Sequence, residues 1–282
     1  MQLGDYQELT VLRETPIAYL LTDGNQEVFL HKKEALDNYL PGSRVRVFIY
    51  PDNAGRWTAS TKEATITLNQ AAFLPVVDHN PKYGIFLDNH LIKHLLCSKD
   101  DLPFNLKEWP ITGDRVFVVM KEKKGLLYGK PVGRKQIASY FSLPPSLEIG
   151  KTYPAWVQTL LPEGLVAFTE RGEEIFIHNN NTRQPHRLGQ AVEARILKLT
   201  ETNEYVGTLI EQKEIMLHED GLRILAYMDQ HNKEMPYTDQ TNPEIIQEVF
   251  RMSKSAFKRA LGALYKSGIV ELTPEKTKKT KI

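Results

Sequence analysis

Two short strand-like segments, Val28-Phe-Leu-His31 and Ile175-Phe-Ile-His178, each end in a histidine and decide how the chain is organised. A glycine follows each histidine by 11 residues, at Gly42 and Gly189, and an alternating apolar run comes directly after it. The two copies are offset by 147 residues, without a gap from about residue 18 to residue 61. A shared register of this length, with histidine and glycine in step, indicates an internal repeat.

A divergent copy lies between these two. Gly113-Asp-Arg-Val-Phe-Val-Val-Met120 repeats the glycine and the alternating run, and Leu95-Leu-Cys97 stands roughly where Phe29-Leu-His31 stands in the first copy. This middle copy lacks the histidine and carries an insertion around residues 98–110. We therefore expect three units, of which the middle one is mainly a spacer.

Each unit has short strands with a period of two, bounded by turn residues. In the first copy the pattern predicts five strands, and the dipeptide Asp23-Gly24 marks a hairpin between two of them. Five short strands in about 65 residues are typical of a small closed barrel of the OB type, in which closure removes exposed strand edges. The expected strands cover residues 7–13, 17–22, 26–31, 44–50 and 56–61.

The pattern apolar-x-apolar-His, followed after about 11 residues by Gly-x-x-Val-x-Val, resembles the S1-type RNA-binding domain. In that family an aromatic residue precedes the histidine by 12 positions, and Tyr19 fits this spacing in the first copy. The same count in the third copy reaches Val166, with Phe168 two residues further on the same face. The late Asp-x-x-Gly-Arg turn of the family is present in the first copy as Asp52-Asn-Ala-Gly-Arg56.

The S1 resemblance implies RNA binding by aromatic, histidine and arginine side chains, because aromatic faces stack on unpaired bases. The alternative is that the aromatic rings pack the barrel cores and that the histidines are ordinary strand residues. We expect Trp57, which adjoins Arg56, to face the core. The expected RNA-binding residues are Tyr19, His31 and Arg56 in the first copy and Phe168, Arg171, Phe176, His178 and Arg195 in the third.

From about Asp220 the apolar period becomes helical. The pattern predicts a first helix capped at Asp220, a second opened by Asn242-Pro243, and a third capped at Ser253. Gly268 ends the third helix, and a short strand follows it. This order resembles a winged helix-turn-helix domain.

The third helix adds a second candidate surface, because residues 251–266 include five basic side chains and no acidic one. Lys254, Lys258 and Arg259 are the expected contact residues. Their partner is RNA, DNA or a protein, because winged helices also serve as protein-interaction modules. The alternative is an ordinary solvated helix face.

The 282 residues carry 36 basic and 35 acidic side chains, a balance close to neutral for a nucleic-acid binder. By segment, residues 63–138 and 218–282 are mildly basic, and the rest of the chain is mildly acidic. We therefore expect weak electrostatic binding of phosphates, and an affinity for nucleic acid that depends partly on base stacking. No run is long and apolar enough to span a membrane, and a single cysteine, Cys97, is typical of a reducing cytoplasm.

Sequence motifs of common enzymes are absent. The chain has no Gly-x-x-x-x-Gly-Lys-Ser/Thr, Gly-x-Gly-x-x-Gly, Gly-x-Ser-x-Gly or His-Glu-x-x-His motif. His90 and His94 have helical metal-ligand spacing, but the sequence places no third ligand beside them. We expect no enzyme activity, no cofactor and no metal.

Three barrels followed by a winged helix are similar to the conserved virulence factor B family of bacterial regulators over essentially the whole chain. The resemblance implies a cytoplasmic regulator that binds single-stranded RNA, acts post-transcriptionally and uses no membrane. The alternatives are a DNA-binding transcription regulator led by the winged helix, and a protein-interaction module on the ribosome or a nuclease. The sequence specifies no oligomeric state. The expected domains are barrels at residues 1–62, 63–138 and 146–212, a winged helix at 218–273 and a disordered basic tail at 274–282.

Overall fold

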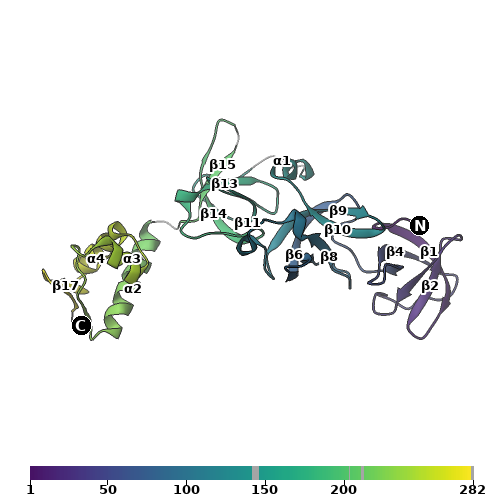
Figure 1. Cartoon of the computed structure of the whole chain (residues 1–282), viewed down its shortest axis with the longest axis horizontal. Coiled ribbons are helices and arrows are strands. Elements are labelled where there is room, and N and C mark those ends of the chain that lie inside the picture. Colours follow the sequence, from purple (N-terminus) through teal and green to yellow (C-terminus); the bar gives the residue numbers. More distant parts are fainter. Residues whose placement is uncertain (142–145, 203, 211–212, 281–282) are drawn as a thin grey trace. The chain divides into compact units, whose positions relative to one another are not determined.

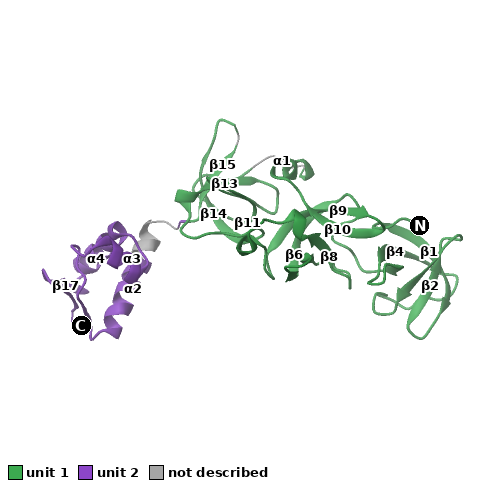
Figure 2. Ribbon diagram, viewed as in Figure 1, with its two compact units in different colours: residues 1–209 green, residues 210–282 purple. Residues whose placement is uncertain are grey.

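The computed structural model describes residues 1–141, 146–202, 204–210 and 213–280, which belong to two compact units, Met1–Leu209 and Ile210–Ile282 (Figure 1, Figure 2). Within these residues the first unit contains three closed five-stranded barrels, and the second contains three helices and a three-stranded sheet. The chain is therefore mainly β with an α+β C-terminal domain, which confirms the predicted fold class.

The first barrel closes in the strand order β1-β2-β3-β5-β4, and its strands match the predicted ranges to within one residue at each end. Side chains alternate strictly between core and solvent along the third strand, because successive residues of a strand point to opposite faces. The strands are β1 (Tyr6–Glu14), β2 (Ala18–Thr22), β3 (Glu27–His31), β4 (Arg44–Pro51) and β5 (Trp57–Ser60).

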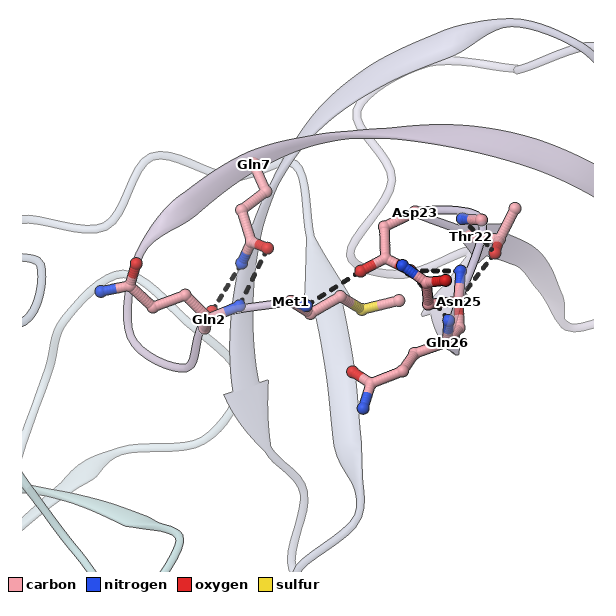
Figure 3. Close-up of polar contacts among 8 residues, drawn as sticks. Met1, Gln2, Gln7, Thr22, Asp23, Asn25 and Gln26 are labelled. Carbon is pink, nitrogen blue, oxygen red and sulfur yellow. Dashed lines mark hydrogen bonds and ion pairs between the residues drawn. The ribbon is translucent and has the colours of Figure 1, made fainter.

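The turn between β2 and β3 is organised by the carboxylate of Asp23 (Figure 3). One carboxylate oxygen accepts hydrogen bonds from the backbone amides of Asn25 and Gln26, at 2.9 and 2.8 Å. The other oxygen accepts one from the amino group of Met1, at 2.9 Å. The Met1 ammonium and these two amides hold the pKa of Asp23 well below its usual range.

The second barrel closes in the order β10-β8-β7-β6-β9. The insertion predicted in this copy holds two short 3-10 helices, Lys99–Asp101 and Leu106–Glu108. Cys97 is fully enclosed in the core, and burial raises the pKa of its thiol to about 12. The strands are β6 (Ala71–Asn80), β7 (Gly84–Leu87), β8 (Leu95–Ser98), β9 (Arg115–Lys123) and β10 (Leu126–Pro131).

The third barrel repeats the strand order of the first, but the predicted gapless register is wrong by one residue. Phe29 pairs with Leu20 in the first barrel, whereas Phe176 pairs with Val166 in the third. The loop that joins the second and third strands is therefore one residue longer in the third barrel than in the first. The spacing from histidine to glycine does not reveal this difference, because it is 11 residues in both copies. The strands are β11 (Thr152–Leu161), β12 (Gly164–Phe168), β13 (Glu174–His178), β14 (Ala191–Leu199) and β15 (Tyr205–Thr208).

The first two barrels share a hydrophobic cluster. Phe48 and Tyr50 of β4 pack in one cluster with Leu74 and other core residues of the second barrel. The side chain of Asn89, which lies between β7 and β8, accepts a hydrogen bond from the backbone amide of Ile66 in the connecting segment at 2.9 Å and donates one to the carbonyl of Ile66 at 3.1 Å. This buried amide fixes the segment between the barrels, since both of its polar groups are paired.

The second and third barrels are joined in a similar way. Phe73 and Phe117 of the second barrel form one buried cluster with Val166 and Phe168 of the third, and helix α1 (Arg134–Ile137) adds to it. The side chain of Gln158 accepts a hydrogen bond from the backbone amide of Phe117 at 2.8 Å and donates one to the backbone carbonyl of Arg115 in the same strand at 3.1 Å. The three barrels therefore pack as one compact unit.

The C-terminal unit has the helix order of a winged helix. Asn242 caps the second helix and Ser253 caps the third, as predicted, with side-chain oxygens that accept from Glu244 and Ala256. The first helix begins at Lys213, so the predicted cap Asp220 lies inside it. The elements are α2 (Lys213–Gln230), β16 (Glu234–Met235), α3 (Pro243–Phe250), α4 (Lys254–Lys266), β17 (Val270–Leu272) and β18 (Thr277–Lys279).

The basic tail predicted to be disordered instead contributes a strand to the wing. The strand β18 lies between β16 and β17 in the sheet, and Thr277 is fully enclosed. The hydroxyl of Thr277 donates to the carbonyl of Tyr237 at 2.8 Å, and Lys279 pairs with Asp229 at 2.8 Å. The lysine-rich composition suggested disorder, but backbone pairing and these contacts order residues 277–279.

Candidate nucleic-acid interface

The strand registers place an equivalent row of three outward-facing residues on each barrel, here called the outer row. The residues of a row pair directly with one another across the second, third and fifth strands, and their neighbours along each strand point into the core. In OB folds this part of the barrel binds oligonucleotides. The outer rows are Leu20, Phe29 and Thr58 in the first barrel, Phe86, Leu96 and Tyr128 in the second, and Val166, Phe176 and Val206 in the third.

The outer row of the first barrel presents an exposed aromatic ring. Phe29 is 53% exposed and shares its face of β3 with His31. Trp57, which the sequence placed in the core, is 38% exposed because it is the first residue of the short strand β5, at the end of the barrel. Arg56 is also exposed, and its Nε and Nη2 atoms donate to Asp52 at 2.9 and 2.7 Å.

The prediction that Tyr19 contacts RNA is wrong. Tyr19 is 1% exposed in the core of the first barrel, where its ring meets that of Tyr39 edge-on at 5.6 Å and its hydroxyl donates to Asn38 at 3.3 Å. Strand alternation puts Tyr19 inward because its neighbour Leu20 points outward. The exposed ring belongs instead to Phe29. Phe29 lies two residues before His31 on the same strand, so strand alternation puts both side chains on the outward face.

The prediction that Phe168 contacts RNA is also wrong. Phe168 is 0% exposed, and every residue of β12 is buried, because the core covers one face of this strand and the second barrel covers the other. Phe176 is half-buried beside this contact, and its ring meets that of the exposed His178 edge-on at 6.4 Å. Much of the outer row of the third barrel therefore serves as an interface between barrels.

The repeated histidines close turns at the ends of their strands. The Nδ1 atoms of His31 and His178 accept hydrogen bonds from backbone amides two residues later, both at 3.1 Å. In the second barrel Ser98 occupies the equivalent place, and its hydroxyl accepts from the amide of Asp100 at 3.3 Å. An imidazole whose Nδ1 accepts a hydrogen bond carries its proton on Nε2, which leaves that atom as a donor for a ligand.

The two predicted arginines of the third barrel differ in their surroundings. Arg171 is exposed, with its Nε atom 4.0 Å from the carboxylate of Glu173. Arg195 is half-buried, and its Nε atom is enclosed without a hydrogen-bond partner among the described residues. Arg171 is therefore accessible to a phosphate, whereas Arg195 contributes little surface.

The three predicted winged-helix residues lie along α4. Lys258 and Arg259 are exposed, and Lys254 is half-buried. Lys258 pairs with Asp239 at 3.6 Å, and Arg259 donates to Ser255 at 3.0 Å. These contacts hold both side chains on the outer face of the helix, where they remain open to solvent.

The remaining sequence features give no second kind of site. Among the described ranges, no group of three or more His, Cys, Asp or Glu side chains is arranged to hold a metal ion. The segment from His90 to His94 is not helical, so the spacing suggested by the sequence does not place the two rings on one helix face. No helix in the described part of the chain is long and apolar enough to cross a membrane.

Three S1-type barrels followed by a winged helix define a protein built from nucleic-acid-binding folds. Residues 3–62 match the S1 domain, residues 71–130 match the "CvfB first S1-like domain", and residues 222–278 match the "CvfB-like winged helix domain". Conserved virulence factor B of Staphylococcus epidermidis is 30% identical over 99% of this chain and 95% of its own. This chain belongs to the conserved virulence factor B family.

Two further relatives agree with this assignment. The uncharacterized protein YitL of Bacillus subtilis is 32% identical over 96% of this chain and 91% of its own. A crystal structure of a multidomain protein with nucleic acid binding domains from Streptococcus pneumoniae aligns with a TM-score of 0.67 and 26% identity, over 99% of this chain and 98% of that one. The similarity therefore extends over nearly the whole length of all three chains.

Proposed function

We propose that this protein binds single-stranded RNA and regulates gene expression post-transcriptionally. The observation that carries the proposal is Phe29, an exposed ring beside His31 on the face that OB folds use for oligonucleotides. An aromatic face stacks on an unpaired base with roughly 1–3 kcal/mol by alanine substitution. Sequence-specific RNA recognition mostly uses unpaired bases, which favours a single strand over a duplex.

Polar groups around Phe29 support the same ligand. The Arg56 guanidinium uses Nε and Nη2 for Asp52, so its Nη1 atom stays available to a phosphate or a base edge. The exposed Trp57 provides a second aromatic surface next to it. Aromatic rings beside cations form the combination that single-stranded nucleic acids require.

Further candidate RNA contacts lie on the third barrel and, separately, on the winged helix. The exposed side chains of Arg171 and His178 belong to the third barrel, and those of Lys258 and Arg259 belong to α4. Because the chain is close to neutral overall, these contacts add modest electrostatic attraction to base stacking. The name of the staphylococcal relatives suggests that the regulated genes include virulence factors. We place this activity in the cytoplasm, with no catalytic step.

Side-by-side titration of labelled single-stranded RNA, single-stranded DNA and duplex DNA at two salt concentrations tests the proposal. We expect single-stranded RNA to bind most tightly, with a shallow salt dependence. Tighter binding of duplex DNA would instead support a transcription regulator led by the exposed face of α4. If no nucleic acid binds at moderate salt, a protein-interaction module becomes the better explanation.

A further inference from the structure

A cleft of about 750 Å³ opens on the outer row of the second barrel, the unit that the sequence suggested was mainly a spacer. Phe86, Leu96 and Tyr128 line it and pair side by side across β7, β8 and β10. All three are half-buried and point away from the core. The cleft thus offers two aromatic rings and an aliphatic side chain to a planar ligand, at a size usual for small-molecule pockets.

The two ends of this cleft differ in charge. Because β8 and β10 run parallel, residues that precede them lie at one end and residues that follow them lie at the other. Lys93 precedes β8, and Lys123 pairs with the first residue of β10, so both lie at one end. Asp100 and Asp101 follow β8 and lie at the other end with Lys130. A phosphate is therefore favoured at the end that holds Lys93 and Lys123.

The basic end meets the first barrel at its turn from Asp52 to Arg56. Asn53 of this turn lines the cleft, and the ammonium of Lys93 donates to the backbone carbonyl of Asp52 at 2.8 Å. Arg56 and Trp57, at the far side of the same turn, are the exposed neighbours of the first outer row. One turn therefore connects the cleft to the proposed RNA surface of the first barrel.

Neither lysine of the basic end forms an ion pair with a carboxylate of a residue that the structure describes. The ammonium of Lys93 instead donates to the backbone carbonyl of Asp52, whose carboxylate binds Arg56. Partial burial lowers the pKa of Lys93, and an incoming phosphate would offset this desolvation. Positive charge beside aromatic rings favours a nucleic-acid ligand over an apolar peptide.

We propose that this cleft binds a base of the RNA strand that contacts Phe29, stacked against Tyr128 and Phe86, with the adjoining phosphate at Lys93 and Lys123. The inference rests on the proposed function, since it assigns a second segment of the same strand. It makes the middle barrel a binding unit. One strand then runs from the outer row of the first barrel, past the turn at Asn53, into the cleft.

The test compares Tyr128→Ala/Lys123→Ala with the wild-type protein, using labelled oligouridylates of increasing length at fixed salt. A short oligomer reaches only the first barrel, whereas a longer one also fills the cleft. We expect the double variant to bind the longest oligomer at least about tenfold more weakly, with little change for the shortest one. Photo-crosslinking of 4-thiouridine oligomers should also label peptides that contain Phe86 or Tyr128.

The matched control is Tyr83→Ala/Lys82→Ala, which removes the same residue types from an exposed pair of the same barrel, outside the cleft. This control should bind like the wild-type protein, and protection of Cys97 from thiol reagents reports that the second barrel is folded in each variant. Wild-type affinity in the cleft variant, or equal losses in both variants, would overturn the inference and leave the proposed function standing. Failure of the wild-type protein to bind any oligomer would overturn both.

Discussion

Arg187 of the third barrel donates two hydrogen bonds to the carboxylate of Asp114 in the second barrel, from Nε at 2.7 Å and from Nη2 at 2.9 Å. Asp114 is buried, and one of its oxygens also accepts from the backbone amide of Ile111 at 2.8 Å. The pair supplements the apolar contact between Phe117 and Phe168. Together they hold the third barrel so that Phe168 packs on its neighbour and is unavailable to RNA.

Arg187→Ala should weaken the attachment of the third barrel to the second. Among the described residues, the substitution leaves the buried carboxylate with one backbone partner, so we expect the free energy of unfolding to fall by about 2 kcal/mol. Urea denaturation at pH 7 measures this change. Lys198→Ala, an exposed substitution on β14 of the same barrel, is the control and should have almost no effect. Equal stability of the two variants would show that the ion pair contributes nothing to the attachment.

Phe29→Ala should lower RNA affinity without unfolding the first barrel. Removing a stacking ring should weaken binding by about tenfold or more, whereas an exposed side chain contributes little to stability. Fluorescence anisotropy with a single-stranded RNA measures the affinity, and thermal unfolding checks the fold.

Two controls separate stacking from general loss of apolar surface in the first barrel. Leu36→Ala removes another exposed apolar side chain, and Tyr19→Phe keeps a ring that is enclosed in the core. Both should bind RNA like the wild-type protein. Loss of affinity in Tyr19→Phe that matches Phe29→Ala would contradict the assignment of the binding face.

The thiol of Cys97 should be inert in the folded protein. Burial raises its pKa to about 12, so almost no thiolate exists at pH 8, and the side chain is also enclosed. We expect an aromatic disulfide reagent to release no colour with the native protein and one equivalent after unfolding in urea, because the chain has one cysteine. Rapid labelling of the native protein would mean that the second barrel opens readily.

Gly262→Ala should stabilise the winged helix and still impair RNA binding. A Cβ at this helical position meets open space, so we expect about 0.5–1 kcal/mol of added stability. If RNA approaches the α4 face that carries Lys258 and Arg259, the added methyl group should lower the affinity. Gly221→Ala in α2 is the control, because its Cβ would make only ordinary contact with Leu264. Unchanged binding in Gly262→Ala would place the RNA away from this part of α4.

Asp23→Asn should reduce stability more at neutral pH than in acid. The pKa of Asp23 is lowered in the folded state, so its stabilising effect is present above the ordinary pKa of about 4 and disappears as the pH falls through the folded value. Unfolding by urea at pH 7 and pH 3 should therefore show a difference from the wild-type protein that shrinks at the lower pH. Asp37→Asn, at an exposed position without an ion pair among the described residues, should behave like the wild-type protein at both. A difference that is larger at pH 3 would contradict the lowered pKa.

Much of the architecture was predictable because it depends on local patterns. The alternation of apolar residues located the strands of the first barrel, and Asn242 and Ser253 located the starts of α3 and α4. Caps and alternation depend on residues within a few positions along the chain. The strand β18 was missed, since it depends on pairing with the distant strands β16 and β17, and α2 begins before its predicted cap.

The binding surface was only partly predictable. His31, Arg56 and His178 are exposed as expected, but Tyr19 and Phe168 are buried. In the third copy, sequence spacing could not predict which residues of β12 point outward, because one extra loop residue shifts β12 against β13. A one-residue shift exchanges the inward and outward faces of a strand.

The sequence by itself determined that this chain is three S1-type barrels and a winged helix, because short-range periodicity and turn chemistry specify such small domains. Only the tertiary structure decided which of the three equivalent outer rows remain open. The first stays exposed at Phe29, the second lines a cleft at Tyr128, and the third is largely covered through Val166 and Phe168. Packing between barrels brings together residues far apart in the chain, and no local pattern encodes which faces that packing covers.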